Sequence, residues 1–165
     1  MTLAHILFPS PVGDLTLVAS DTGLVAILWQ DDDPARVRLA AREVRTDHPI
    51  LAMAQAQLTD YFAGARRAFT VPLDACGTPF QQMVWAALRD IPFGETRSYG
   101  DIARAIGRPT ASRAVGAANG RNPLSIIAPC HRVVGANGAL TGFAGGVKTK
   151  RWLLDLERKA IDDKE

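Results

Sequence analysis

The 165-residue sequence predicts a chain of the α/β class in its α+β form. We expect a small sheet-and-helix domain at residues 1–74 and a mostly helical domain with a helix-turn-helix at 75–165. Three observations predict this division. The first 30 positions hold short β-prone runs separated by turn residues, and helical spacing with helix caps dominates after residue 78. The composition changes over residues 65–77, the expected linker. Hydrophobic residues make up 47% of the chain, enough for a buried core.

Three strands are expected at the N-terminus. Ile6–Pro9, Leu15–Ala19 and Leu24–Trp29 are apolar or alternating runs of strand length. Turn-forming residues at Ser10–Asp14 and Ser20–Gly23 separate them. This order predicts an antiparallel meander.

Two helices are expected to follow these strands. The acids Asp31–Asp33 and Pro34 are typical of a helix start, because acids favour the N-terminal end of the helix dipole and proline fits the first turn. This helix is expected to reach about Arg45. A second helix is predicted over Leu51–Ala63, with its apolar residues on one side and Gly64 at its end.

The C-terminal half begins with two well-marked helix starts. Thr78-Pro79 provides an N-cap and a first-turn proline, and that helix stops at Ile91–Gly94. Ser98, with Asp101 three residues later, predicts a capped short helix at Tyr99–Ile106.

A further short helix completes a helix-turn-helix pattern. Gly107–Thr110 is a tight turn, and the next helix is expected over about Ala111–Asn119, ending at Gly120. Any helical hairpin shows the same spacing, so DNA binding and plain packing both stay open here. A last helix is predicted over about Val147–Lys159.

Charge is unevenly distributed along the chain, although the net charge is only +2. Residues 86–151 carry ten basic and three acidic side chains, whereas the segments on either side are net acidic. A basic middle fits a surface that faces phosphates, and a solvated face with scattered arginines is the alternative.

The predicted second helix of the hairpin is made of small residues. Base reading in the major groove needs long polar side chains, whereas small ones allow the close backbone approach that suits the minor groove. Arg113 is its one long side chain and is a candidate wedge in the base stack. Packing against a neighbouring helix is the alternative for the small residues. The expected minor-groove contacts are Ala111, Ser112, Ala114 and Gly116.

Several classes of protein are disfavoured. No apolar run approaches the roughly 20 residues of a membrane span, and the N-terminus lacks the pattern of a secretory signal, so a cytoplasmic location is expected. The two cysteines, Cys76 and Cys130, form no CxxC, and the three histidines are scattered, so neither a disulfide framework nor a metal site is expected. The glycine-rich run at residues 142–146 lacks nucleotide-binding spacing, and no cofactor is expected.

Cys130 is the candidate nucleophile. It lies in the run Pro129-Cys130-His131-Arg132, where basic neighbours are expected to lower the pKa of its thiol. An inert buried cysteine is the alternative, and it is favoured for Cys76. Because adjacent side chains on a turn diverge, a water is expected between Cys130 and His131. Glu157, at the edge of the apolar side of the last helix, is either a buried partner of His131 or a surface group.

The ordered motifs between about Cys76 and Glu157 resemble those of the O6-alkylguanine-DNA alkyltransferase family. The N-terminal half is similar only in outline, as a ribonuclease-H-like domain. The matching runs are Gly77-Thr78-Pro79-Phe80-Gln81, Ile91–Thr96, Ser98-Tyr99-Gly100, Arg113-Ala114-Val115-Gly116, Asn122-Pro123, Pro129–Val133 and Thr141–Gly146.

The resemblance implies a suicidal methyltransferase that repairs DNA by direct reversal. One alkyl group passes irreversibly from O6-methylguanine in double-stranded DNA to Cys130, after minor-groove binding and base flipping. Activity on O4-methylthymine and cooperative assembly of a monomeric protein on DNA stay open. No cofactor or metal is implied for this chain.

The resemblance also implies a role for each site residue. His131 deprotonates Cys130 through a water, Glu157 orients His131, and Asn122 braces the helix-turn-helix against the active-site turn. Tyr99 displaces a phosphate and binds the departing guanine, while Arg113 fills the gap left by the flipped base. The remaining pocket residues implied are Val133, Phe143, Ala144 and Gly145.

One position departs from the family pattern, because Phe143 stands where tyrosine is common. The apolar wall is kept and a hydroxyl is lost, which bears on substrate preference. Three other classes of protein are alternatives: an alkyltransferase-like protein that binds damage without transfer, a helix-turn-helix regulator, and a cysteine hydrolase. Cys130 argues against the first, and no oxyanion hole is evident for the third.

Overall fold

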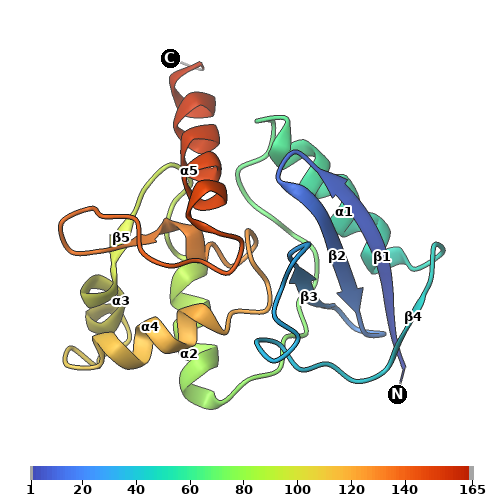
Figure 1. The fold of residues 1–165 in the computed structure, drawn as a ribbon, viewed down its shortest axis with the longest axis horizontal. Helices are drawn as coiled ribbons and strands as arrows, with labels where there is room; N and C mark the ends of the chain where they lie inside the picture. Colours follow the sequence, from blue (N-terminus) through green and yellow to red (C-terminus); the bar gives the residue numbers. More distant parts are fainter. Residues whose placement is uncertain (1, 164–165) are drawn as a thin grey trace.

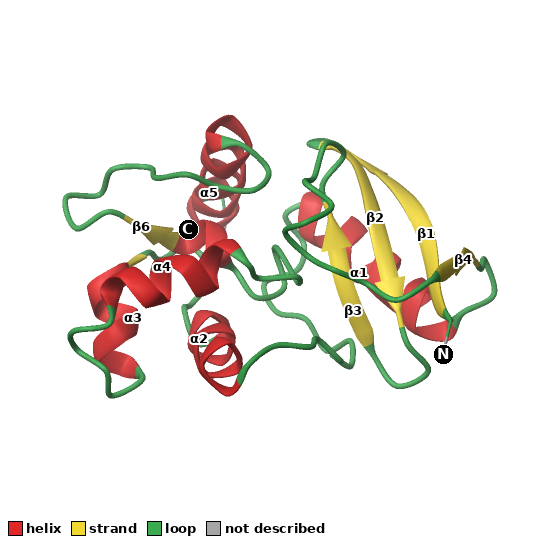
Figure 2. Cartoon of the chain, turned by 60° about the horizontal axis from the view of Figure 1, so that its bottom comes forward, coloured by secondary structure: helices red, strands yellow, loops and turns green. Residues whose placement is uncertain are grey.

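The computed structural model describes residues 2–163, which form two lobes side by side (Figure 1). The N-terminal lobe is a four-stranded sheet of order β3-β2-β1-β4 with helix α1 against one face (Figures 1 and 2). Its elements are β1 (Leu3–Ser10), β2 (Gly13–Ala19), β3 (Leu24–Leu28), β4 (Arg42–Val44) and α1 (Pro49–Phe62).

The predicted antiparallel meander is confirmed. β1 pairs with β2 from Ala4↔Ala19 to Ser10↔Gly13, and β2 pairs antiparallel with β3. Gly13 closes the first turn at φ +106°, a conformation that side chains with a Cβ rarely adopt. Strand period and turn residues therefore sufficed to predict this part of the sheet.

The predicted helix from Pro34 to about Arg45 is wrong. The chain makes one turn near Asp33 and then runs extended into β4, which pairs parallel with β1. Arg36 makes one local and one long-range contact: its guanidinium pairs with Asp32 at 2.7 Å and donates to the Asn122 carbonyl, 86 residues away, at 2.8 Å. These contacts, together with pairing of β4 on the sheet, outweigh a local preference worth only tenths of a kcal/mol per residue.

Helix α1 agrees with its prediction within two residues. His48 caps it through Nδ1, which accepts the Ile50 N–H, and Pro49 occupies the first position. The chain then leaves the helix through Gly64 at φ +77°.

The C-terminal lobe is mostly helical and also holds two very short strands. The capping box expected at Ser98 and Asp101 is present, and Thr78 caps α2 together with Gln81. Helices α4 and α5 end one and three residues later than predicted. The elements are α2 (Pro79–Arg89), β5 (Arg97–Ser98), α3 (Tyr99–Ala105), α4 (Ser112–Gly120), the 3-10 turn η1 (Cys130–Arg132), β6 (Val133–Val134) and α5 (Val147–Asp162).

A buried loop of the C-terminal lobe enters the core of the N-terminal lobe. Residues 124–128 pack with the sheet and α1, and the Ile27 N–H of β3 donates to the Pro123 carbonyl at 2.8 Å. Ile126 in this loop has φ +75°, which costs on the order of 1–3 kcal/mol for such a residue. The shared core holds this strained turn, which leads directly to Cys130.

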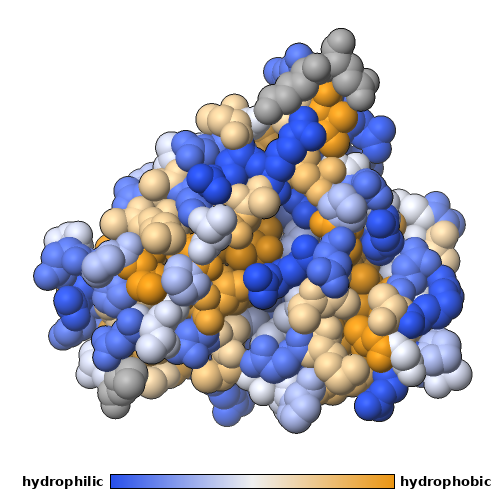
Figure 3. All heavy atoms as spheres, turned by 180° about the vertical axis from the view of Figure 1, so that it is seen from behind, coloured by the Kyte–Doolittle hydropathy of each residue, from blue (hydrophilic) through white to orange (hydrophobic). Residues whose placement is uncertain are grey.

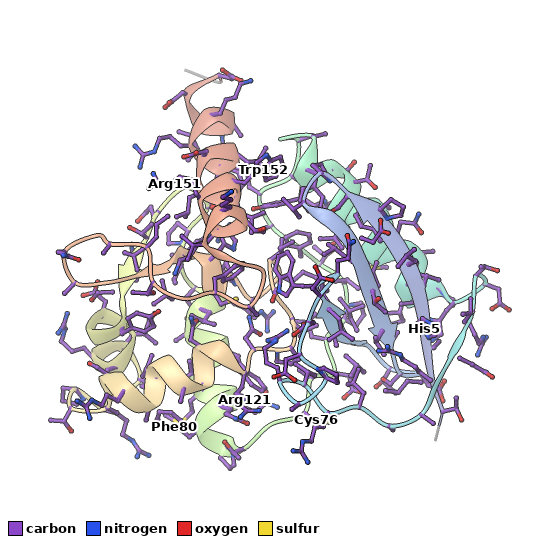
Figure 4. All side chains as sticks on the ribbon, in the orientation of Figure 1. His5, Cys76, Phe80, Arg121, Arg151 and Trp152 are labelled. Carbon is purple, nitrogen blue, oxygen red and sulfur yellow. The ribbon has the colours of Figure 1, made fainter. Side chains whose placement is uncertain are left out.

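Helix α5 also joins the lobes. Trp152 points from α5 towards the N-terminal lobe (Figure 4), and its ring centroid lies 6.0 Å from that of Phe62 in α1.

Seen from behind, the far end of α5 projects from a surface on which apolar and hydrophilic residues are interspersed (Figure 3). No helix within residues 2–163 is both long and apolar enough to span a membrane.

Candidate active site

Cys130 is the first residue of the turn η1 and is only 4% exposed. Asn122 holds the segment that precedes the turn: its Nδ2 donates to the Ala128 carbonyl at 2.7 Å, and its Oδ1 accepts the Leu124 N–H at 3.0 Å. The amide therefore closes the buried loop that leads to the thiol.

His131 and Glu157 form a fully buried pair. His131 Nε2 lies 2.6 Å from Glu157 Oε2, and both residues have no exposed surface. Of the two alternatives for Glu157, the structure has the buried partner. The other ring nitrogen, Nδ1, is buried without a hydrogen-bond partner among the residues described. That nitrogen is the one available to take a proton from a thiol or a water.

Glu157 accepts hydrogen bonds at both oxygens. Arg132 donates to Oε1 at 2.8 Å and to Oε2 at 3.0 Å, the Gly94 N–H donates to Oε1 at 3.2 Å, and the Tyr61 hydroxyl donates to Oε2 at 2.6 Å. Burial by itself would raise the pKa of Glu157, but His131 and Arg132 lower it to about 2. The carboxylate is thus ionised over the physiological range.

The thiol and the imidazole are both neutral at rest. Burial raises the pKa of Cys130, and hydrogen bonds to Asn122 and Ser125 with the charges of Arg36 and Lys150 only partly oppose it. The prediction that basic neighbours lower this pKa is therefore wrong for the resting protein, because desolvation outweighs them. Burial likewise lowers the pKa of His131 against the pull of Glu157. A neutral imidazole can act as a general base.

Two basic residues near the thiol, Lys150 and Arg36, were not predicted from the sequence. Lys150 is completely buried on α5, and its Nζ donates to Thr141 Oγ1 at 3.3 Å. Its spacing to Leu153 and Glu157 on the buried side of the helix was the signal that could have found it. Arg36 had no such signal, because it reaches the loop near Cys130 from 86 residues away.

Some of the residues predicted to line the substrate pocket pack around Cys130. Val133 belongs to the same buried cluster as Cys130, with Tyr99 and Phe143 packed against it. Parallel pairing of Arg97–Ser98 with Val133–Val134 places the start of α3 beside the active-site turn. Ala144 is exposed.

The N-terminal lobe supplies one wall of this region. Trp29 stacks edge-on against Phe143 at 5.3 Å, and a Cβ on Gly145 would lie 2.8 Å from its ring. Its indole N–H donates to Ser125 Oγ at 3.2 Å, and that hydroxyl lies 4.0 Å from Cys130 Sγ. Glycine at 145 is therefore required by a close approach between the lobes.

The predicted DNA contacts on and next to α4 differ in exposure. Arg113 and Ala114 are exposed, whereas Ala111, Ser112 and Gly116 are half-buried. Arg113 has no ion pair within the described part of the chain. The ring of Tyr99 lies 3.8 Å from a Cβ built on Gly116 and also packs against the buried cluster that holds Cys130, so Tyr99 connects α4 with that cluster.

A buried cysteine that directly precedes an imidazole–carboxylate pair in the sequence is an arrangement typical of the thiol-nucleophile class. Two family models match the sequence: the ribonuclease-like domain of 6-O-methylguanine DNA methyltransferase at residues 3–75, and the DNA binding domain of 6-O-methylguanine DNA methyltransferase at residues 79–159. The chain belongs to the 6-O-methylguanine DNA methyltransferase family.

Individual relatives agree over almost the whole chain. The methylated-DNA–protein-cysteine methyltransferase of Mycobacterium tuberculosis is 51% identical over 151 residues, 90% of this chain and 88% of that protein. The constitutive one of Bacillus subtilis is 46% identical over 159 residues, 94% and 95% of the two chains. The crystal structure of Mycobacterium tuberculosis OGT in complex with DNA matches with a TM-score of 0.83 and 46% identity, covering 97% of this chain and 94% of that one.

Proposed function

We propose that this protein moves the alkyl group from O6 of an alkylated guanine in double-stranded DNA onto Sγ of Cys130, once per molecule. Membership of the family makes the chain a DNA-repair enzyme that transfers an alkyl group. The acceptor residue, the damaged base and the single turnover are the proposed parts. The observation that carries them is the buried Cys130 thiol directly before the His131–Glu157 pair.

The proposed chemistry balances without a cofactor. Neutral His131 takes the thiol proton through a bridging water, and the sulfur lone pair forms a bond to the alkyl carbon. The bond from that carbon to O6 breaks, and its electron pair leaves on guanine, which regains a proton. The thiol hydrogen and the alkyl group have then exchanged places. A thioether is a poor substrate for reversal, so the protein is consumed.

The geometry around Tyr99 suits a departing base. Lys150 donates to Thr141 Oγ1, and Thr141 also lies 2.5 Å from the Tyr99 hydroxyl. Thr141 is therefore able to donate its own hydrogen to Tyr99, which leaves the phenol O–H free to bond to guanine. Such a bond would favour the leaving group as negative charge develops on it.

We propose that α3 and α4 act as a helix-turn-helix that enters the minor groove, with α4 against the DNA. The solved relative in complex with DNA supports DNA as the partner. An alkyl group on O6 is inaccessible inside a duplex, so the base must be flipped out at a cost of a few kcal/mol. Arg113, which is exposed and has no ion pair within residues 2–163, is the side chain that would fill the gap.

The division of labour and the location are also proposals. We propose that residues 1–74 support the active-site loop and residues 75–165 bind DNA and accept the alkyl group. We propose that the protein is a monomer in solution. Both Cys76, on the segment between the lobes (Figure 4), and Cys130 are free thiols, which supports the reducing cytoplasm.

The transfer is tested with an oligonucleotide duplex that carries isotope-labelled O6-methylguanine. After incubation, peptide mass spectrometry is expected to find one label per protein, on Cys130. Cys130→Ser should carry no label, and Cys76→Ser, the matched control, should be labelled as the wild type is. Label on any other residue, or none on pure folded protein, would contradict the proposal.

The wedge role predicts a split between two substrates for Arg113→Ala. The variant should lose about tenfold or more of its rate on duplex DNA, because a gap in the stack costs at least 1–3 kcal/mol. Its rate on free O6-benzylguanine should stay unchanged, since no base is flipped. Parallel rate measurements on both substrates check this, and equal losses would refute the wedge.

A further inference from the structure

Tyr61 is a buried hydroxyl group of the N-terminal lobe that reaches the centre of the active site. It lies on α1, has no exposed surface, and donates to Glu157 Oε2 at 2.6 Å across 96 residues of sequence. Three aromatic rings hold it at centroid distances of 5.5 to 6.3 Å: Phe62, Phe69 and Phe93. These rings surround the phenol, and its O–H points at Glu157.

The oxygen that Tyr61 binds is the oxygen that orients the imidazole. Glu157 Oε2 receives Tyr61, His131 and one Arg132 nitrogen, while Oε1 receives Arg132 and the Gly94 N–H. A carboxylate offers about four lone-pair positions, two on each oxygen. Tyr61 and His131 therefore share a crowded acceptor, and a stronger bond to one weakens the bond to the other.

We propose that Tyr61 is a positioning residue for alkyl transfer, which holds Glu157 Oε2 in place and withdraws negative charge from it, and thereby sets the basicity of His131. The inference rests on the proposed function, because it gives His131 the task of accepting the Cys130 proton. It also makes the N-terminal lobe a direct contributor to the reaction centre.

The charged groups around the imidazole determine whether Tyr61 raises or lowers the basicity of His131. Glu157 favours a proton on His131, whereas Arg132 from η1 and Lys150 from α5 disfavour it. The neighbouring Cys130 is neutral at rest and becomes negative in the reaction. A donor on Glu157 reduces the one favourable influence, so Tyr61 keeps His131 less basic than the bare pair would be. Burial and Glu157 raise the pKa of Tyr61 well above 10, so its proton stays in place.

The test is the pH dependence of the single-turnover rate with free O6-benzylguanine, for wild type and Tyr61→Phe. Removing the hydroxyl leaves Oε2 more negative, so His131 becomes easier to protonate and the low-pH limb of the rate profile moves to higher pH, by about half a pH unit. Proton NMR titration of the His131 ring should show a rise in its pKa in the same variant, with no activity involved.

Phe69→Leu is the matched control, because it loosens the same aromatic cluster without touching Glu157. It should lower thermal stability and leave the midpoint of the pH profile in place. In a Glu157→Gln background, adding Tyr61→Phe should produce no further shift, because the charge that Tyr61 moderates is gone.

The outcomes separate this inference from the proposed function. A uniform loss of rate in Tyr61→Phe with an unmoved midpoint, or a midpoint at lower pH, would overturn the role of Tyr61 alone. If wild-type protein transfers no benzyl group to Cys130, the proposed function falls, and this inference falls with it.

Discussion

Glu157→Gln is expected to lower the rate of alkyl transfer on the order of 10²- to 10⁴-fold, the range found when a general base loses its orienting partner. The side chain keeps its size, but the amide nitrogen of glutamine is a donor. It would face either His131 Nε2 or the Arg132 guanidinium, both of which donate to Glu157 in the structure. Single-turnover rates on duplex DNA and on free O6-benzylguanine should fall alike, because the loss lies in the chemical step.

The same substitution is expected to destabilise the fold by about 3–5 kcal/mol, because Arg132 is left buried without its counter-charge.

The free energy of unfolding is expected to fall as the pH falls. The pKa of Glu157 is depressed from 4.5 to about 2, so its stabilisation is complete above pH 4.5 and is lost as the pH falls towards 2. Urea unfolding over this range should show a steep acid loss in wild type and a smaller one in the variant. Equal slopes, or a rate within threefold of wild type, would contradict the buried relay.

Asn122→Ala is expected to remove about 2–4 kcal/mol of stability, because it strands the Ala128 carbonyl and the Leu124 N–H inside the protein. The loop that these bonds close carries the strained Ile126 and ends at Cys130, so the thiol should lose its position as well. We expect at least a hundredfold slower transfer even on free O6-benzylguanine. Thermal unfolding and single-turnover rates measure the two effects.

Asn119→Ala is the matched control for this prediction. Asn119 is buried on α4 within the same lobe, but its Oδ1 has no hydrogen-bond partner within residues 2–163. It should therefore cost clearly less stability and leave the rate of transfer nearly unchanged. If both asparagine variants behaved alike, Asn122 would be an ordinary buried residue and not a brace.

The parts of the fold that the sequence predicted correctly depend on neighbours along the chain. The cap of Ser98 with Asp101 forms within four residues, and the turn at Gly13 closes between adjacent strands. The helix expected at residues 34–45 also followed from local signals, but Arg36 there is bound to the Asn122 carbonyl in the other lobe. Local preference decided the structure wherever no distant contact opposed it.

The candidate site likewise has features that the sequence predicted and features that depend on distant contacts. Cys130, His131 and Glu157 were proposed as a relay from the sequence, and the structure brings His131 and Glu157 into contact inside the core. The direction of the pKa shift of Cys130 was predicted wrongly, because sequence shows which charges are adjacent but not how much water burial removes. Tyr61 was not predicted at all.

By itself, the sequence determined the order of strands and capped helices, the candidate nucleophile and its family, because these depend on spacing within short segments. Only the tertiary structure decided that Glu157 is buried, that the thiol is neutral at rest, and that Tyr61 and Trp29 of the N-terminal lobe reach the active-site loop. Those features arise from burial and from contacts between residues 96 positions apart, and such distances leave no periodic trace in a sequence.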